Sequence, residues 1–155
     1  MIKTIIIDDE KLAREGLKAL LKEFTDIEII AEASNADEGL DLIDKLKPQL
    51  IFLDIQMPEK TGFEMLEELI ESPAIIFTTA YNEFAIKAFE VNALDYILKP
   101  IETSRLHEAI AKAKKQIALL DEQRGTQRLA EDSQVYIRDG ERCWYVRLSD
   151  IRLIE

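Results

Sequence analysis

The stretch Gln49-Leu50-Ile51-Phe52-Leu53-Asp54-Ile55-Gln56-Met57-Pro58 is a continuous apolar run that reaches a single carboxylate at Asp54 and then a proline turn. Such a run is typical of a strand buried on both faces, as in a parallel sheet covered by helices. Asp54 then lies at the carboxyl end of the strand, where open parallel sheets bind ligands. It is a candidate nucleophile or metal ligand, unless it only caps the strand or begins a turn. The other strand ends decide between these alternatives.

The composition indicates a globular protein with an acidic surface. The 155 residues are enough for one domain and a small appendage, and 47% are hydrophobic and 33% charged. No apolar run approaches the ~20 residues of a membrane span. A net charge of -11 and a pI of about 4.7 predict weak affinity for nucleic acid, so a basic partner or a hard cation is the better complement.

Two features favour a cytoplasmic location without membrane attachment. Met1 leads almost directly into a predicted strand, so we expect no secretory signal. Cys143 is the single cysteine and cannot form an internal disulfide, which fits a reducing compartment.

Strand and helix patterns alternate along the first 120 residues. Strands are predicted over residues 2–7, 27–33, 50–53, 74–77 and 94–98. Apolar residues at helical spacing follow them over residues 12–24, 40–46, 63–70, 82–91 and 106–120. Ser34, with Asp37 three residues later, is the predicted N-cap of the second helix, and Asn82 that of the fourth. Asn92 is expected to end the fourth helix in a left-handed conformation.

This alternation predicts a parallel α/β fold with helices on both faces of the sheet. Two strand orders are common for such chains, and five strands favour the flavodoxin-like order 2-1-3-4-5. That order puts the first and third strands side by side. Asp8 and Asp9, which follow the first strand, would then share one crevice with Asp54.

The predicted strand ends carry the groups that phosphoryl transfer to a carboxylate requires. Three adjacent carboxylates repel one another unless a cation joins them, and Mg²⁺ prefers such oxygen ligands. Thr79 and Lys99 follow the fourth and fifth strands, where they could contact a phosphoryl group while Asp54 attacks. The sequence has no glycine-rich nucleotide loop, so no bound nucleotide or flavin is expected.

Each residue also has an ordinary explanation. Asp8 or Asp9 could cap the first helix, Thr79 could be a normal strand residue, and Lys99 could be a solvated surface lysine. The functional interpretation depends on all of them, together with Asp54, lying at strand exits.

The motifs resemble the receiver domain of bacterial two-component response regulators over about residues 1–120. They are Asp8-Asp9, Leu53-Asp54-Ile55-Gln56-Met57-Pro58 with Gly62, Thr79-Ala80, and Asp95-Tyr96-Ile97-Leu98-Lys99-Pro100. The resemblance implies that Asp54 accepts a phosphoryl group from the phosphohistidine of a sensor histidine kinase. It implies a Mg²⁺ ion held by Asp9, Asp54 and the backbone carbonyl of Gln56, with Asp8 in the outer shell. It also implies movement of Thr79 toward the phosphoryl group, an inward turn of Tyr96, and a cis bond between Lys99 and Pro100.

A phosphoryl group adds close to two negative charges, which would bias the face formed by helix four, strand five and helix five. Phe84, Ile86 and Phe89 are more apolar than a solvated helix requires, although core packing explains at least one of them. Our hypothesis is that this face forms a homodimer on phosphorylation.

The C-terminal residues predict a second, incomplete domain. Residues 121–133 are polar and contain Gly125, which indicates a linker that partly continues the fifth helix. Residues 134–155 contain a hairpin pattern around Asp139-Gly140 and a third strand pattern, too little for an independent sheet. They resemble the opening strands of a LytTR-type DNA-binding domain, and the segment from Tyr81 to Phe89 is typical of receivers attached to one. Any DNA contacts would then come from beyond residue 155.

The favoured function is a phosphorylation-controlled regulator of transcription, with two alternatives. One is a receiver that acts only through protein contacts. The other is a Mg²⁺-dependent phosphatase that uses Asp54 as its nucleophile; it would need an acid two residues later, where Gln56 stands. We therefore expect no enzyme activity beyond the receiver's own phosphorylation and dephosphorylation. His107, the sole histidine, is expected on the surface of the fifth helix.

Overall fold

The computed structural model describes residues 1–133, with side chains described through residue 121 except at positions 86 and 89. The strands are β1 (Ile2–Ile7), β2 (Ile27–Ala33), β3 (Leu50–Asp54), β4 (Ala74–Thr79) and β5 (Asp95–Leu98). The helices are α1 (Lys11–Leu21), α2 (Ala36–Leu46), α3 (Gly62–Glu67), α4 (Ala85–Glu90) and α5 (Thr103–Ser133), and the 3₁₀ turn η1 (Asn82–Phe84) precedes α4.

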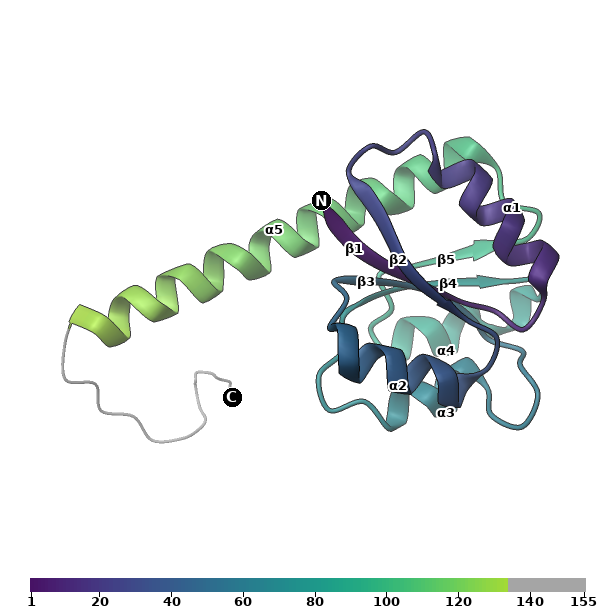
Figure 1. The fold of residues 1–155 in the computed structure, drawn as a ribbon, viewed down its shortest axis with the longest axis horizontal. Coiled ribbons are helices and arrows are strands. Elements are labelled where there is room, and N and C mark those ends of the chain that lie inside the picture. The colour runs from purple at the N-terminus through teal and green to yellow at the C-terminus, as the bar shows by residue number, and fades with distance from the viewer. Residues whose placement is uncertain (134–155) are drawn as a thin grey trace. The chain divides into compact units, whose positions relative to one another are not determined.

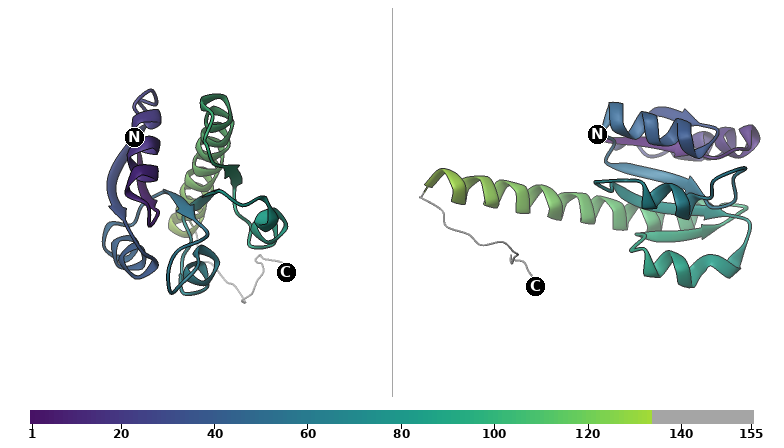
Figure 2. Two further views of the ribbon diagram at one scale, coloured as in Figure 1. Left: turned by 90° about the vertical axis from the view of Figure 1, so that its right-hand side faces the viewer. Right: turned by 90° about the horizontal axis from the view of Figure 1, so that it is seen from below.

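The five strands form one parallel sheet in the order β2-β1-β3-β4-β5, which confirms the predicted flavodoxin-like fold. Helix α1 and the first turns of α5 cover one face, and α2, α3 and α4 cover the other (Figures 1 and 2). The sheet therefore lies between two apolar layers, as helices on both faces of a parallel sheet require.

Strand β3 contributes buried side chains to both apolar layers. Leu50, Ile51, Phe52 and Leu53 are completely buried. Ile51 and Leu53 pack under α2 and α3, whereas Leu50 and Phe52 pack under α1 and α5. Burial of each such side chain stabilises the fold by about 1.5–3 kcal/mol. This is why the strand shows a continuous apolar run rather than an alternating one.

Three local predictions were wrong. The N-cap of α2 is Asn35 rather than Ser34: the Asn35 side chain accepts a hydrogen bond from the Glu38 N–H at 2.8 Å. Helix α3 ends at Glu67, which leaves Ile70 fully exposed. Asn82 lies inside the 3₁₀ turn, so it does not cap α4. Asn92 does adopt the predicted left-handed conformation, with φ 62°.

Gly39 lets α2 approach the sheet closely. A Cβ atom there would lie 2.7 Å from Ile7 Cδ1 and 3.3 Å from Met65 Sδ. Glycine destabilises a helix by about 1 kcal/mol relative to alanine. Here it also permits the close contact between α2 and β1.

The chain divides into two units, Met1–Ile117 and Ala118–Glu155. Residues 121–133, predicted as a linker that partly continues the fifth helix, are helical throughout. The predictions for residues 134–155, including the hairpin and the LytTR-like strands, lie outside the described residues. Among residues 1–133, no helix combines the length and the apolarity needed to span a bilayer.

Candidate functional site

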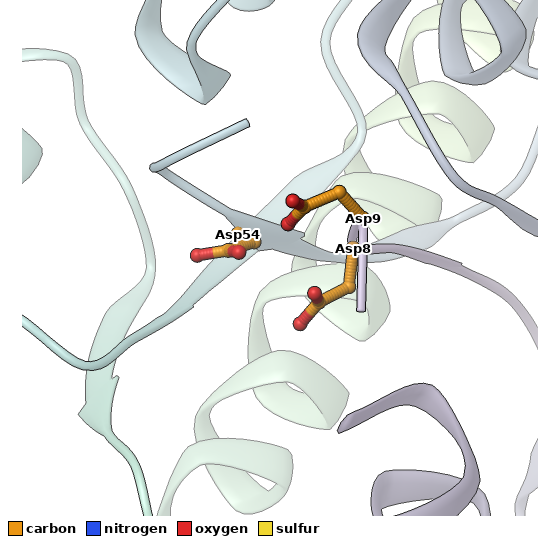
Figure 3. Close-up of side chains that lie close together, drawn as sticks. All are labelled: Asp8, Asp9 and Asp54. Carbon is orange, nitrogen blue, oxygen red and sulfur yellow. The ribbon is translucent and has the colours of Figure 1, made fainter. Parts of the chain in front are cut away.

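Three carboxylates meet at the carboxyl edge of the sheet. Asp8 and Asp9 directly follow β1, and Asp54 is the last residue of β3; one carboxylate oxygen from each lies within 4.8 Å of the others (Figure 3). The parallel pairing of Ile7 with Leu53 brings these strand ends to the same level. Asp8 and Asp54 are buried, whereas Asp9 is exposed. The sequence prediction that the three acids meet is therefore confirmed.

Asp8 is held by both oxygens of its carboxylate. Oδ1 accepts a hydrogen bond from the Glu10 N–H at 2.9 Å, and Oδ2 accepts one from Lys99 Nζ at 2.7 Å. The Asp8 N–H donates to the Ala33 carbonyl of β2 at 3.0 Å. Asp8 is thus held at its N–H and at both carboxylate oxygens.

Asp54 has a pKa raised to about 7. The main cause is burial of its carboxylate, followed by the charge of Asp8. Lys99, whose Nζ lies 3.7 Å from Asp54 Oδ2, lowers this pKa, and Asp9 raises it further. The ionised form of Asp54 is therefore disfavoured in the site, and a bound cation would stabilise it. A set of hard oxygen donors with excess negative charge fits a divalent cation such as Mg²⁺.

Lys99, which directly follows β5, supplies a positively charged side chain to the site. Its backbone N–H donates to the Thr79 carbonyl at 2.7 Å, and its peptide bond to Pro100 is cis, as predicted. Burial lowers the pKa of Lys99, but the hydrogen bond to Asp8 and the charge of Asp54 outweigh burial and raise it above its ordinary value. Lys99 is therefore protonated where a phosphoryl oxygen would need a counter-charge.

Thr79 and Tyr96 are connected through the backbone of Tyr81. Thr79 is completely buried at the end of β4, and its Oγ1 accepts a hydrogen bond from the Tyr81 N–H at 3.3 Å. The half-buried Tyr96 donates its hydroxyl hydrogen to the Tyr81 carbonyl. Residue 81 thus links the threonine at the end of β4 to the tyrosine on β5.

The predicted dimer face contains one residue that packs inward. Phe84 is half-buried against the core, and its ring centroid lies 6.0 Å from that of Phe63. The side chains of Ile86 and Phe89 lie outside the described residues. His107 is exposed on α5, in contact with the Phe24 ring at 4.5 Å between centroids.

Two further residues shape the site: Gly62, which belongs to the sequence motif, and Arg14, which the sequence did not single out. Gly62 donates its N–H to the Ile55 carbonyl at 2.9 Å, and a Cβ atom there would lie 2.6 Å from the Asp54 carbonyl oxygen. Arg14 of α1 donates to the Asp8 carbonyl at 2.6 Å. The Gly62 turn was visible as a motif, but a helical arginine gives no sign in the sequence that it reaches a strand end.

The comparisons with known proteins agree with this fold and site. The response regulator receiver domain model matches residues 4–111, so the chain belongs to the family of receiver-containing, two-component response regulators. The transcriptional regulatory protein BtsR of Escherichia coli K12 is 50% identical over 129 residues, which cover 79% of this chain and 54% of BtsR. The sensory transduction protein LytT of Bacillus anthracis is 40% identical over 158 residues, which cover 97% of this chain and 64% of LytT. The chain therefore spans only part of the length of these relatives.

Solved structures show the same fold. The response regulatory domain of mrkE from Klebsiella pneumoniae superposes with a TM-score of 0.69 at 33% identity, covering 76% of this chain and 99% of that domain. The receiver domain of AraT from Geobacillus stearothermophilus has a TM-score of 0.69 at 32% identity, covering 77% and 98%.

Proposed function

We propose that Asp54 accepts a phosphoryl group from the phosphohistidine of a sensor histidine kinase. The observation that carries this proposal is the position of Asp54: its carboxylate lies at a strand end beside two other acids and 3.7 Å from a protonated lysine. This is the set of groups that phosphoryl transfer needs, a nucleophile with fixed counter-charges around it.

In the proposed step, a carboxylate oxygen of Asp54 forms a bond to phosphorus while the bond from phosphorus to the histidine nitrogen breaks. The nitrogen keeps the electron pair of that bond and takes up a proton from solvent. Lys99 offsets the charge on the phosphoryl oxygens, and Thr79 donates a hydrogen bond to one of them. The product is an acyl phosphate on Asp54.

The acidic cluster is the proposed Mg²⁺ site. Asp9, Asp54 and the backbone carbonyl of Gln56 would hold the ion, with Asp8 in the outer shell because both of its carboxylate oxygens already accept hydrogen bonds. When bound, Mg²⁺ supplies positive charge that favours the transferring phosphoryl group. The same site would support self-phosphorylation from a small acyl phosphate and self-dephosphorylation, with no other enzyme activity.

Phosphorylation would act on the rest of the domain through Thr79. Its Oγ1 has one hydrogen-bond donor here, the Tyr81 N–H. The Thr79 hydroxyl can donate to a phosphoryl group on Asp54 while its oxygen still accepts, so it is movement of Thr79 toward that group that would break its hydrogen bond with the Tyr81 N–H. Residue 81, and with it the hydroxyl of Tyr96, would then be released. The face of α4, β5 and α5, with Phe84, Ile86 and Phe89, would then form a homodimer. A sedimentation run that shows the same monomer with and without beryllofluoride would contradict the dimer.

The proposed full-length protein is a cytoplasmic transcription regulator. Residues 1–120 would be the receiver, 121–133 the linker, and 134–155 the start of a LytTR-type domain that binds DNA through residues beyond this chain. The support is the name of BtsR, a transcriptional regulatory protein, and the longer match to LytT.

The test is intact mass after incubation with a small acyl phosphate donor. Wild type should gain one phosphoryl group with Mg²⁺ and none with a chelator, and Asp54→Asn should gain none. Asp41→Asn, which changes an exposed acid on α2, is the matched control and should behave as wild type. Phosphorylation of Asp54→Asn at the wild-type rate would refute the assignment.

A further inference from the structure

Arg14 connects the acidic loop to the neighbouring strand. Its Nη1 donates to the Asp8 carbonyl oxygen at 2.6 Å, and its Nε donates to Glu32 Oε1 at 2.7 Å. Its side chain is only 13% exposed. One guanidinium thus joins the end of β1 to β2 by two hydrogen bonds, a geometry that its planar fork favours.

Glu32 is itself fixed from two sides. It pairs with Ile6 of β1 in the sheet register, and its second oxygen contacts Lys18 Nζ at 2.6 Å. The hydrogen bond from Lys18, followed by that from Arg14, lowers the pKa of Glu32, which keeps it ionised at neutral pH. The partner of Arg14 is therefore a strand residue whose carboxylate Lys18 also binds.

The Asp8 carbonyl belongs to the peptide group that leads into Asp9. A hydrogen bond to this oxygen sets the orientation of that peptide plane, and therefore the direction in which the Asp9 side chain leaves the backbone. The Asp8 N–H and carboxylate are already held by Ala33, Glu10 and Lys99. Arg14 holds the remaining polar group of Asp8, the one closest to Asp9.

We infer that Arg14 is a positioning residue for the metal site: it orients the Asp8–Asp9 peptide so that the exposed carboxylate of Asp9 faces Asp54. This inference rests on the proposed function, because it takes Asp9 and Asp54 as the ligands. It assigns no direct contact between Arg14 and the ion. Partners that orient metal ligands typically contribute 10–100-fold to affinity.

The test is the dissociation constant for Mg²⁺, measured by amide chemical-shift titration on folded protein. Arg14→Ala should weaken binding about tenfold. Arg14→Lys should not restore it, because a single ammonium cannot reproduce the two directed hydrogen bonds to Asp8 and Glu32. Lys18→Ala is the matched control: it removes the other cation of Glu32, leaves the Asp8 carbonyl contact, and should stay within about twofold of wild type.

A second measurement separates positioning from general damage. With a small acyl phosphate donor, Arg14→Ala should need about tenfold more Mg²⁺ for half-maximal phosphorylation, but its rate at saturating Mg²⁺ should approach that of wild type. A lower saturated rate with an unchanged Mg²⁺ requirement would overturn the inference. So would Arg14→Ala or Arg14→Lys with wild-type Mg²⁺ affinity.

Glu32→Ala carries the test if Arg14 variants do not fold. It keeps the arginine but removes the carboxylate that Arg14 binds, so the Mg²⁺ dissociation constant should rise, as in Arg14→Ala. An unchanged dissociation constant contradicts the inference. Measurements on wild type separate a failure of the proposed function from a failure of the role of Arg14. If wild type itself does not bind Mg²⁺ or become phosphorylated, the proposed function fails; if it does both while the variants match it, only the role of Arg14 fails.

Discussion

Replacing Arg105 by alanine should lower the stability of the domain, because this arginine of α5 binds two residues of β5. Arg105 donates two hydrogen bonds to the Asp95 carboxylate and a third to the Tyr96 carbonyl at 3.0 Å. The side chain of Asp95 is only 7% exposed. The variant leaves this carboxylate with the Tyr96 N–H at 2.8 Å and with Lys112, which is 3.3 Å away and mostly exposed.

The expected loss of stability is about 2–3 kcal/mol. Removing one partner of a fully buried ion pair costs about 3–5 kcal/mol, and the value is lower here because Arg105 is one-third exposed and Lys112 remains. For a domain of this size the thermal midpoint should fall by about 8–12 °C. Chemical denaturation of wild type and Arg105→Ala measures the difference. Lys112→Ala is the control and should cost less than about 1 kcal/mol.

The pH dependence gives the sharper result. Burial alone would raise the pKa of Asp95, but the Arg105 hydrogen bonds, with those of Tyr96 and Lys112, bring it below its ordinary value. A lowered folded-state pKa adds stability that is complete above the unfolded pKa of about 3.9 and disappears as the pH falls through the folded value. The stability gap between wild type and variant should therefore narrow as the pH falls below about 3.9. A gap that does not narrow however far the pH falls below about 3.9, or one below about 1 kcal/mol at neutral pH, would refute this prediction.

Four further outcomes test the fold and the site. Gly62→Ala should lose about 1–3 kcal/mol and phosphorylate more slowly, since its Cβ would lie 2.6 Å from the Asp54 carbonyl oxygen. Gly16→Ala, with no atom within 4 Å of its Cβ, should gain up to about 1 kcal/mol; urea denaturation compares the two. Asn35→Ala should lose about 1 kcal/mol by the same assay, and an equal or larger loss for Ser34→Ala would contradict the cap assignment. Mg²⁺ at a hundredfold excess over its dissociation constant should stabilise wild type by about 2.7 kcal/mol in thermal denaturation, and an undiminished effect in Asp54→Asn would argue against that ligand.

The sheet and the acidic cluster follow from the sequence because both depend on long-range regularities. A strand without polar residues must be buried on both faces, and in a parallel sheet every carboxyl end lies at one edge. Asp8, Asp9 and Asp54 therefore had to meet once β1 and β3 became neighbours. Neither statement requires the position of any individual helix.

The errors arose where neighbouring residues have equal local preferences. Ser34 and Asn35 are both good helix caps, and Glu38 decides between them because its carboxylate takes the Ser34 N–H at 2.7 Å and its own N–H bonds to Asn35. The apolar spacing that reaches Ile70 is helical, but the α3 helix ends three residues earlier. Leu12 fits the same kind of spacing on α1 and is 86% exposed.

The polar contacts that orient the site could not be predicted, because they join residues far apart in the chain. Arg14 occupies a polar position of an amphipathic helix, and only the packing of α1 beside β2 brings it to Glu32 and the Asp8 carbonyl. The link from Thr79 to Tyr96 passes through backbone atoms of Tyr81, which carry no sequence signal.

Chemical mapping of the phosphoryl group tests the central claim most directly. An acyl phosphate on aspartate is reduced by borohydride to homoserine, so protein phosphorylated with Mg²⁺ and a small acyl phosphate donor, then reduced and digested, reports its own attachment site. We expect homoserine at position 54 and aspartate at positions 8 and 9. Homoserine at position 8 or 9 with aspartate intact at 54, or no homoserine in protein shown by mass to be phosphorylated, would contradict it.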